Sequence, residues 1–236
     1  MIEFKNISKS FGKLKVLNDV NLSCIKGECI ALIGPNGCGK TTLMKTLLGM
    51  VIPNKGDIIF KGHTIKNHFE YRQHIGYMPQ IGRYPDNMTI GQIVKMITNI
   101  RKPQMEVDNF LYQQYNLDSI SNKRMSTLSG GTTQKVSATL AFLFNPEVLI
   151  LDEPTAGLDP LSSEILKEKI LKEKEAGKLI IITSHLLNEL DDLITQLIYM
   201  QDGKVLFHKT IDEIKTQTGE IKISKAIAGI MKSAIL

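Results

Sequence analysis

The sequence contains no tryptophan and only three cysteines, and aromatic residues make up 6% of its 236 positions. An odd number of cysteines in a chain of this length argues against a framework of disulfides. No apolar run approaches the roughly 18 to 20 residues that a membrane-spanning helix requires. The first residues include an early acid and lack the basic start and apolar stretch of a secretory signal. The sequence therefore predicts a cytoplasmic protein.

Charge of one sign is also not concentrated anywhere in the chain. The net charge of +5 comes from 29 basic and 24 acidic residues, and a basic balance can indicate nucleic-acid or membrane binding. The basic side chains are interleaved with apolar and acidic positions, and no block of five like charges occurs. A solvated surface is therefore expected, with no direct nucleic-acid partner.

Residues 34–42 carry the strongest chemical signal. They read G-P-N-G-C-G-K-T-T and follow the apolar run Cys29–Ile33. Glycines let several backbone N–H groups approach phosphate oxygens, while Lys40 supplies a positive charge for the β and γ phosphates and Thr41 a hydroxyl for Mg²⁺. A strand, such a loop and a helix in this order are typical of nucleoside triphosphatases. The predicted nucleotide-binding residues of the loop are Gly34, Pro35, Asn36, Gly37, Cys38, Gly39, Lys40, Thr41 and Thr42.

Cys38 leaves two interpretations open. It precedes a predicted helix, whose N-terminus would favour a thiolate and hence a redox switch. A small, tolerated filler of the loop is the simpler interpretation.

Hydrophobic spacing divides the rest of the chain. Short alternating runs within residues 2–25 predict antiparallel strands, and the wholly apolar runs 148–151 and 179–182 predict buried parallel strands. Between Thr89 and Lys123 apolar residues recur at helical spacing.

The predicted fold class is α/β: a P-loop NTPase core with a mostly parallel sheet and flanking helices, an N-terminal antiparallel β lobe and an inserted α-helical subdomain. We expect a single domain over residues 1–236, with the helical insert at 84–128 and a short C-terminal tail at 217–236.

Further motifs stand at fixed places around this core. Leu128-Ser129-Gly130-Gly131-Thr132 directly precedes a helical run, and twenty residues later the apolar run 148–151 delivers Asp152 and Glu153 at the end of a predicted strand. Ligands of open α/β sheets bind at such strand ends. Together with the phosphate loop, Gln80, Asp159 and His185, this ordered set resembles that of the ATP-binding cassette (ABC) ATPases of transporters, over about residues 1 to 215.

The resemblance implies a division of chemical roles. Asp152, Thr41 and Gln80 are expected to hold Mg²⁺, which prefers oxygen ligands. Glu153 is expected to be the general base that orients or deprotonates the attacking water. His185 resembles the switch histidine that reaches the γ-phosphate. With Lys40 and Gln80, these two residues form the expected catalytic set.

The resemblance also implies that two copies share each ATP. Ser129, Gly130 and Gly131 would form a second anion site, which serves the nucleotide of the other subunit. Asp159 lies in a segment that resembles the family's loop linking the two sites across this interface. Phe11 stands where the family stacks an aromatic ring on adenine, but a ring stacks on any base, so ATP as the nucleotide is implied by the resemblance. Thr132 departs from the glutamine commonly found after the two glycines.

The function implied by the resemblance is that of an ATP-hydrolysing subunit that powers a membrane transporter. The expected partners are a transmembrane permease and a second copy of the chain, which places the protein on the inner face of the cell membrane. The permease is expected at a groove lined by Tyr84, Pro85, Met88 and Ile90. Among transporters, residues 128–136 and the compact length are similar to the ATPase of the copper-linked system that matures nitrous oxide reductase.

Two other classes of protein remain as alternatives. A soluble ABC ATPase of nucleic-acid repair or translation would suit the basic charge. However, repair relatives carry a long coiled coil between phosphate loop and signature, and translation factors fuse two cassettes; this chain has neither. A P-loop kinase or GTPase would need no Ser129-Gly130-Gly131 segment. The cargo, its direction and the identity of the permease are not encoded in these motifs.

Overall fold

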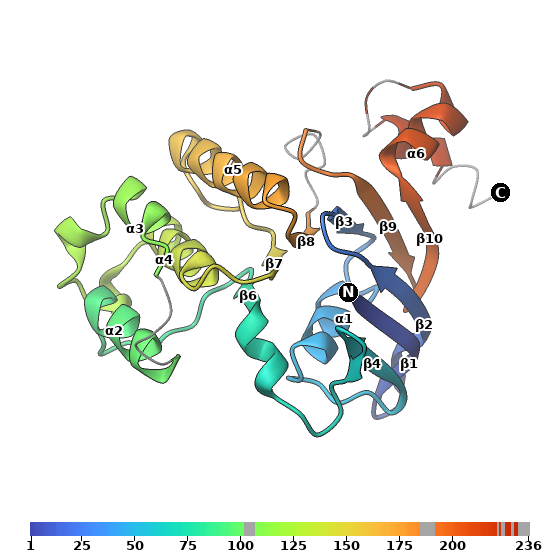
Figure 1. The fold of residues 1–236 in the computed structure, drawn as a ribbon, viewed down its shortest axis with the longest axis horizontal. Helices are drawn as coiled ribbons and strands as arrows, with labels where there is room; N and C mark the ends of the chain where they lie inside the picture. Colours follow the sequence, from blue (N-terminus) through green and yellow to red (C-terminus); the bar gives the residue numbers. More distant parts are fainter. Residues whose placement is uncertain (102–106, 185–191, 221, 223–224, 228, 231–236) are drawn as a thin grey trace. The chain divides into compact units, whose positions relative to one another are not determined.

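The computed structural model describes residues 1–101, 107–184, 192–220, 222, 225–227 and 229–230. These residues belong to two compact units. The first unit combines Met1–Tyr71 with Leu179–Leu236, and the second is Arg72–Lys178. Figure 1 shows the elements of both, coloured along the chain.

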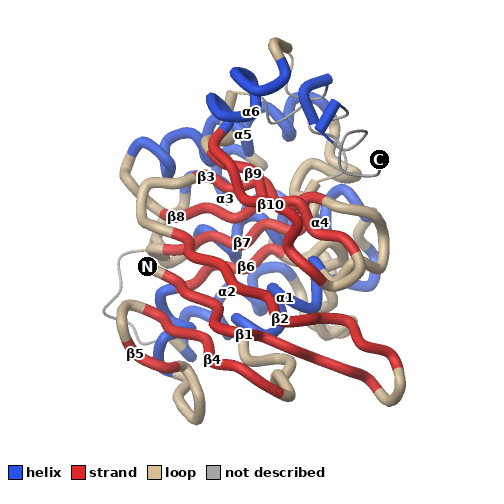
Figure 2. The backbone as a smooth tube through the Cα atoms, turned by 90° about the vertical axis from the view of Figure 1, so that its right-hand side faces the viewer, coloured by secondary structure: helices blue, strands red, loops and turns tan. Residues whose placement is uncertain are grey.

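The first unit begins with an antiparallel sheet. Its strands are β1 (Ile2–Phe11), β2 (Leu14–Cys24), β4 (Lys55–Phe60) and β5 (His63–Thr64), in the order β2-β1-β4-β5. Both neighbours of β1 run antiparallel to it, and Figure 2 shows β4 returning beside β1. Ile2 and Phe4 are buried in the alternation of a sheet with one apolar face, and Ile7 is also buried beyond a shift of the register between Phe4 and Ile7. The predicted N-terminal antiparallel lobe is confirmed.

A second set of strands in this unit supports the phosphate loop. The central strand β3 (Cys29–Ile33) lies parallel to both β8 (Leu179–Thr183) and β9 (Gln196–Gln201). Every residue of β3 and β8 is buried, which explains the apolar runs Cys29–Ile33 and Leu179–Ile182. The strand β10 (Lys204–Thr210) pairs antiparallel with β9 through a tight turn, in which Asp202 and Gly203 both have positive φ. The helices of this unit are α1 (Lys40–Leu47) and α6 (Ile211–Thr218).

The second unit is built on two parallel strands, β6 (Ile75–Met78) and β7 (Val148–Asp152). Its helices are α2 (Ile90–Ile100), α3 (Phe110–Gln114), α4 (Gly130–Phe142) and α5 (Pro160–Glu175). Short 3₁₀ turns are η1 (Glu70–His74), which begins in the first unit, η2 (Asp118–Ile120) and η3 (Met125–Thr127). Thr89 is the N-cap of α2, and its side chain forms a capping box with Gln92.

The predicted α/β class with a mostly parallel core sheet is confirmed, because β3–β8, β3–β9 and β6–β7 are all parallel pairs. Helices α2 and α3 fall within the predicted insert, although the proposed limits of that insert stay a prediction. The predicted tail at 217–236 lies partly outside the described residues. Of the helices in the described part of the chain, none combines the length and apolar character that a membrane span requires.

Candidate active site

The phosphate loop connects β3 to α1 in the first unit. Gly34, Gly37 and Gly39 all have positive φ, and Pro35, Asn36 and Gly37 are exposed. At Gly34 a Cβ atom would lie 2.0 Å from the carbonyl oxygen of Met200 and 2.8 Å from Sγ of Cys38. A side chain at this position would therefore collide with the backbone of β9, so the loop can pack there only as glycine.

Lys40 is the first residue of α1 and is 8% exposed. Its Nζ donates to the backbone carbonyl oxygens of Gly34 at 2.7 Å and Pro35 at 3.2 Å, so the ammonium group lies against the loop. Thr41, the next residue, is exposed. A helix N-terminus, a cation and an exposed hydroxyl thus meet at one loop, which suits phosphate and its magnesium ion.

Gln80 and Glu153 meet at the carboxyl ends of two parallel strands in the second unit. Met78 of β6 is in register with Leu151 of β7, and Gln80 and Glu153 each lie two residues beyond this pair. Nε2 of Gln80 donates a hydrogen bond of 3.0 Å to Oε2 of Glu153. The sequence predicted both side chains at strand ends, and the register explains why they touch.

Asp152 and Glu153, at the carboxyl end of β7, have different surroundings. Asp152 ends the strand and is 7% exposed. Burial of Tyr77 raises the pKa of its hydroxyl to about 12, and the nearby charge of Asp152 contributes to this increase. Glu153 follows with φ of 49°, in the left-handed region that residues other than glycine seldom adopt. This turn carries Glu153 away from the line of the strand, so the two neighbouring acids face different environments.

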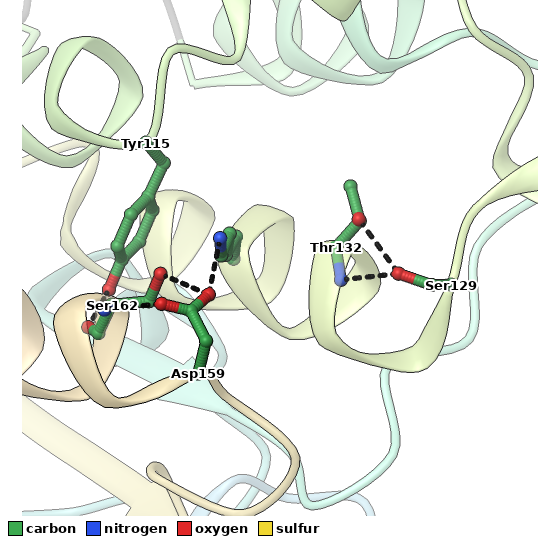
Figure 3. A network of polar contacts seen from close by, with 6 residues as sticks. Tyr115, Ser129, Thr132, Asp159 and Ser162 are labelled. Carbon is green, nitrogen blue, oxygen red and sulfur yellow. Dashed lines mark hydrogen bonds and ion pairs between the residues drawn. The ribbon is translucent and has the colours of Figure 1, made fainter.

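Ser129 caps the N-terminus of α4. Its Oγ accepts a hydrogen bond of 3.2 Å from the backbone N–H of Thr132 and lies 2.9 Å from the hydroxyl of Thr132, as Figure 3 shows. The threonine that replaces the usual glutamine therefore supports the cap. Ser129 and Gly130 are exposed, so the start of α4 is open to an anion.

Asp159 caps α5 in the same unit. Its carboxylate accepts from the backbone N–H of Ser162 at 3.0 Å and from its hydroxyl at 2.7 Å, and it forms an ion pair of 2.8 Å with Lys135 of α4. The hydroxyl of Tyr115 donates to the carbonyl oxygen of Ser162 (Figure 3). The hydrogen bonds from Lys135 and then Ser162 hold the pKa of Asp159 far below its usual range. The carboxylate is therefore ionised and joins the start of α5 to the second turn of α4.

Comparison with known proteins connects this geometry to a family. Residues 17–156 match the family model described as ABC transporter. The lantibiotic transport ATP-binding protein SrtF of Streptococcus pyogenes is 34% identical over 212 residues, which cover 90% of this chain and 92% of that protein. The chain belongs to the ABC transporter family. Another relative, the uncharacterized ABC transporter ATP-binding protein YhaQ of Bacillus subtilis (strain 168), is 32% identical over 95% of this chain and 76% of its own length.

A solved structure also supports the assignment of this chain to the ABC transporter family. The structure of an ATP-binding subunit of an ABC transporter superimposes with a TM-score of 0.89 at 27% identity, and the match covers 98% of this chain and 99% of that one. The chain is therefore an ABC-type ATPase, as the motifs implied.

Other predicted site residues of the ABC ATPase are placed as follows. Phe11 ends β1 and is 50% exposed, with Nζ of Lys9 5.0 Å from the ring centroid, so one aromatic ring is available for stacking. Cys38 is 3% exposed, and its Sγ lies 3.9 Å from Nζ of Lys40, so the thiol packs on the inner side of the loop. His185 lies outside the described residues. The roles assigned to these residues stay predictions.

The expected permease groove needs one correction. Ile90 is 0% exposed, because it starts the buried face of α2, and a surface groove cannot be lined by it. Met88 does line a hollow of about 650 Å³, together with Asn87 and residues of α2 that the sequence interpretation did not include. The members of this hollow are Asn87, Met88, Gln92, Lys95, Met96, Asn99 and Ile100.

The two glycines after Ser129 differ in their surroundings, which yields a testable pair of substitutions. A Cβ at Gly131 would lie 2.7 Å from the carbonyl oxygen of Gly157, whereas a Cβ at Gly130 meets nothing within 4 Å. We expect Gly131→Ala to lower the free energy of unfolding by about 1–3 kcal/mol through overpacking. Gly130→Ala, the matched control, should leave it unchanged or raise it by up to about 1 kcal/mol. Urea denaturation measures both, and equal effects would contradict the close approach.

Proposed function

We propose that the chain hydrolyses ATP as one half of a homodimer that powers a transmembrane permease. The observation that carries the proposal is the pair formed by Gln80 and Glu153 at the ends of β6 and β7. A carboxylate at a strand end, hydrogen-bonded to an amide that fixes its orientation, suits a general base for an attacking water.

Each part of the site has its own task in this mechanism. Lys40 and the backbone N–H groups at the start of α1 bind the phosphates, and Glu153 accepts the proton of the water, in an orientation that Gln80 sets. Thr41, Asp152 and the side-chain oxygen of Gln80 would provide oxygen ligands for Mg²⁺. The bound ion would neutralise charge on the phosphates. Mg²⁺ is usually bound through few protein ligands together with phosphates, so a hydroxyl and a carboxylate suit it.

A second copy of the chain completes the proposed site. The exposed cap at Ser129 and Gly130 presents the N-terminus of α4, which attracts negative charge. We propose that it contacts the nucleotide bound by the other copy, and that Asp159 lies near this interface. Since all motifs occur in one chain, the dimer would have two competent sites.

The permease is proposed to contact the hollow beside α2. Met96 and Ile100 are exposed on this helix at 37% and 73%, and Lys95 adds a positive charge. An apolar helix with a negative end, supplied by the cytoplasmic side of a permease, would fit such a surface. This partner places the chain at the inner face of the cell membrane.

For the transport system, we propose an export-type assembly with a separate membrane subunit, of the copper-linked class that matures nitrous oxide reductase. The support is the sequence of the segment Leu128–Val136. Relatives are named for lantibiotic transport and for Nod factor export, the latter being a protein of Burkholderia lata at 31% identity. These different cargoes on similar chains indicate that the permease selects the cargo.

The proposal is tested by Lys40→Ala. Loss of the ammonium group should weaken ATP binding by about 10- to 100-fold, because hydrogen bonds to charged groups contribute about 1.5–3 kcal/mol. Equilibrium titration with ATP measures the change, with circular dichroism as the check on folding. Lys45→Ala removes an exposed lysine from the same helix and serves as the control. Unchanged affinity in Lys40→Ala would contradict the phosphate-loop assignment.

A further inference from the structure

Gln134 is a buried amide on the second turn of α4, one turn after the exposed cap. The residue is 6% exposed, and its Nε2 donates a hydrogen bond of 3.2 Å to the backbone carbonyl oxygen of Gln80. This bond joins residues 54 positions apart in the sequence. The chain segment that carries Gln80 is therefore held by α4.

The opposite end of the same side chain is not satisfied. Oε1 of Gln134 is buried and has no hydrogen-bond partner among the described residues. A buried acceptor without a partner is unfavourable, and a methionine of similar length would fill the space without one. Packing alone thus does not explain an amide here, whereas the hydrogen bond to Gln80 does.

A second contact fixes the same segment to the same face of α4. Ser137 stands three residues after Gln134, so the two side chains are neighbours on the helix. Oγ of Ser137 lies 2.8 Å from the hydroxyl of Tyr84, and a Cβ at Gly82 would approach this Oγ to 2.2 Å. The backbone after β6 therefore runs close along α4 from Gln80 to Tyr84.

The contacts form a continuous path from α4 to the proposed base. Gln134 holds the backbone of Gln80, and the side chain of Gln80 donates to Glu153 at 3.0 Å. A shift of the Gln80 backbone would move its amide relative to the carboxylate, and misplacement by about 1 Å can lower a rate by about 10²-fold.

We propose that Gln134 is a positioning residue for ATP hydrolysis, which sets the orientation of Glu153 by fixing the backbone of Gln80. This inference rests on the proposed function, since it assigns a support to the residue pair of that site. Gln134 belongs to the helix that starts at the Ser129 cap, so any contact made at the cap is linked to the base through one rigid element.

The test replaces Gln134 by methionine, which keeps the length of the side chain and removes the donor. We expect kcat for ATP hydrolysis to fall about tenfold while KM for ATP stays within about twofold, because binding uses the phosphate loop of the other unit. Thermal stability should not fall. If Gln134→Met is not recovered folded, Gln134→Asn, whose shorter amide cannot reach Gln80, carries the same expectation.

A matched control separates positioning from general packing. Thr139→Val removes another buried hydrogen bond of α4, since Oγ1 of Thr139 donates only to the carbonyl oxygen of Lys135 in its own helix at 2.9 Å. This variant should keep kcat. An equal loss of kcat in Thr139→Val and Gln134→Met would assign the effect to the helix as a whole and overturn the proposal.

A double-substitution cycle gives the sharpest outcome. If Gln134 acts through Gln80, adding Gln134→Met to Gln80→Ala should change kcat by less than about twofold, because the side chain being positioned is already absent. Additive effects would overturn the proposal, as would full kcat in Gln134→Met. A wild-type protein without ATPase activity would instead contradict the proposed function, which makes the two failures distinguishable.

Discussion

Replacing Glu153 by glutamine should lower the rate of ATP hydrolysis by about 10²- to 10⁴-fold, the range contributed by a general base. Glutamine has the same length and keeps an oxygen that can accept the 3.0 Å hydrogen bond from Nε2 of Gln80. The position of the side chain should therefore be retained while the proton acceptor is lost. ATP binding should be unchanged, because Lys40 and the phosphate loop are not altered.

The measurements are phosphate release under saturating ATP and equilibrium binding of ATP. Slow turnover should also trap the ATP-bound dimer, which size-exclusion chromatography detects. Glu168→Gln removes the same charge from an exposed position on α5 and should keep full turnover. Unchanged turnover in Glu153→Gln would remove Glu153 from its role.

The sequence predicted the strands that carry the site residues, because an apolar run and the motif after it are both local patterns. The apolar runs around β3 and β7 place the phosphate loop and the two carboxylates at strand ends, and the motif order gives the family. Strand register then brings Gln80 and Glu153 to the same edge of the β6–β7 pair. Nothing in the local sequence, however, shows that Glu153 has φ of 49°, since that conformation depends on the surrounding turn.

The residues that the sequence interpretation missed are those whose partners lie far away in the chain. Gln134 contacts Gln80 and Lys135 contacts Asp159, and both contacts depend on how α4 packs. The one sequence feature that could have indicated Gln134 and Lys135 is that they follow the Ser-Gly-Gly segment within four residues. Ile90 was assigned to the permease groove because it follows soon after Gln80 in the sequence, whereas its helical period places it on the buried face of α2.

A buried ionic cluster fixes the C-terminal end of α5. Glu173 forms ion pairs with both Lys169 and Lys178, while Asp108 pairs with Lys169 and the amide oxygen of Asn145 accepts from Lys178. Lys169, Glu173 and Lys178 are each at most 9% exposed. Burial lowers the pKa of Lys169, but its hydrogen bonds to Asp108 and Glu173 outweigh burial and raise it above the usual value. The ammonium group of Lys169 therefore stays charged, and Glu173 forms ion pairs with both lysines.

Glu173→Leu should lower the free energy of unfolding by about 3–5 kcal/mol, the usual result of removing one partner from a buried ion pair. Lys169 keeps Asp108, but Lys178 keeps only the neutral amide of Asn145 among the described residues. Urea denaturation at constant pH measures the loss. Glu175→Leu, an exposed position in the same turn, should change the value by less than about 0.5 kcal/mol.

The double variant Glu173→Leu with Lys178→Met decides whether an unpaired charge causes this loss. Methionine removes the ammonium group that Glu173→Leu leaves without a carboxylate, so the double variant should be more stable than Glu173→Leu alone. A further decrease would mean that packing of the lysine stem, and not its charge, dominates. The outcome bears on the site as well, because the cluster fixes one end of α5 while the bond from Lys135 to Asp159 fixes the other. Loosening the cluster should therefore leave the Asp159 cap attached to α4 and reduce stability before it reduces turnover.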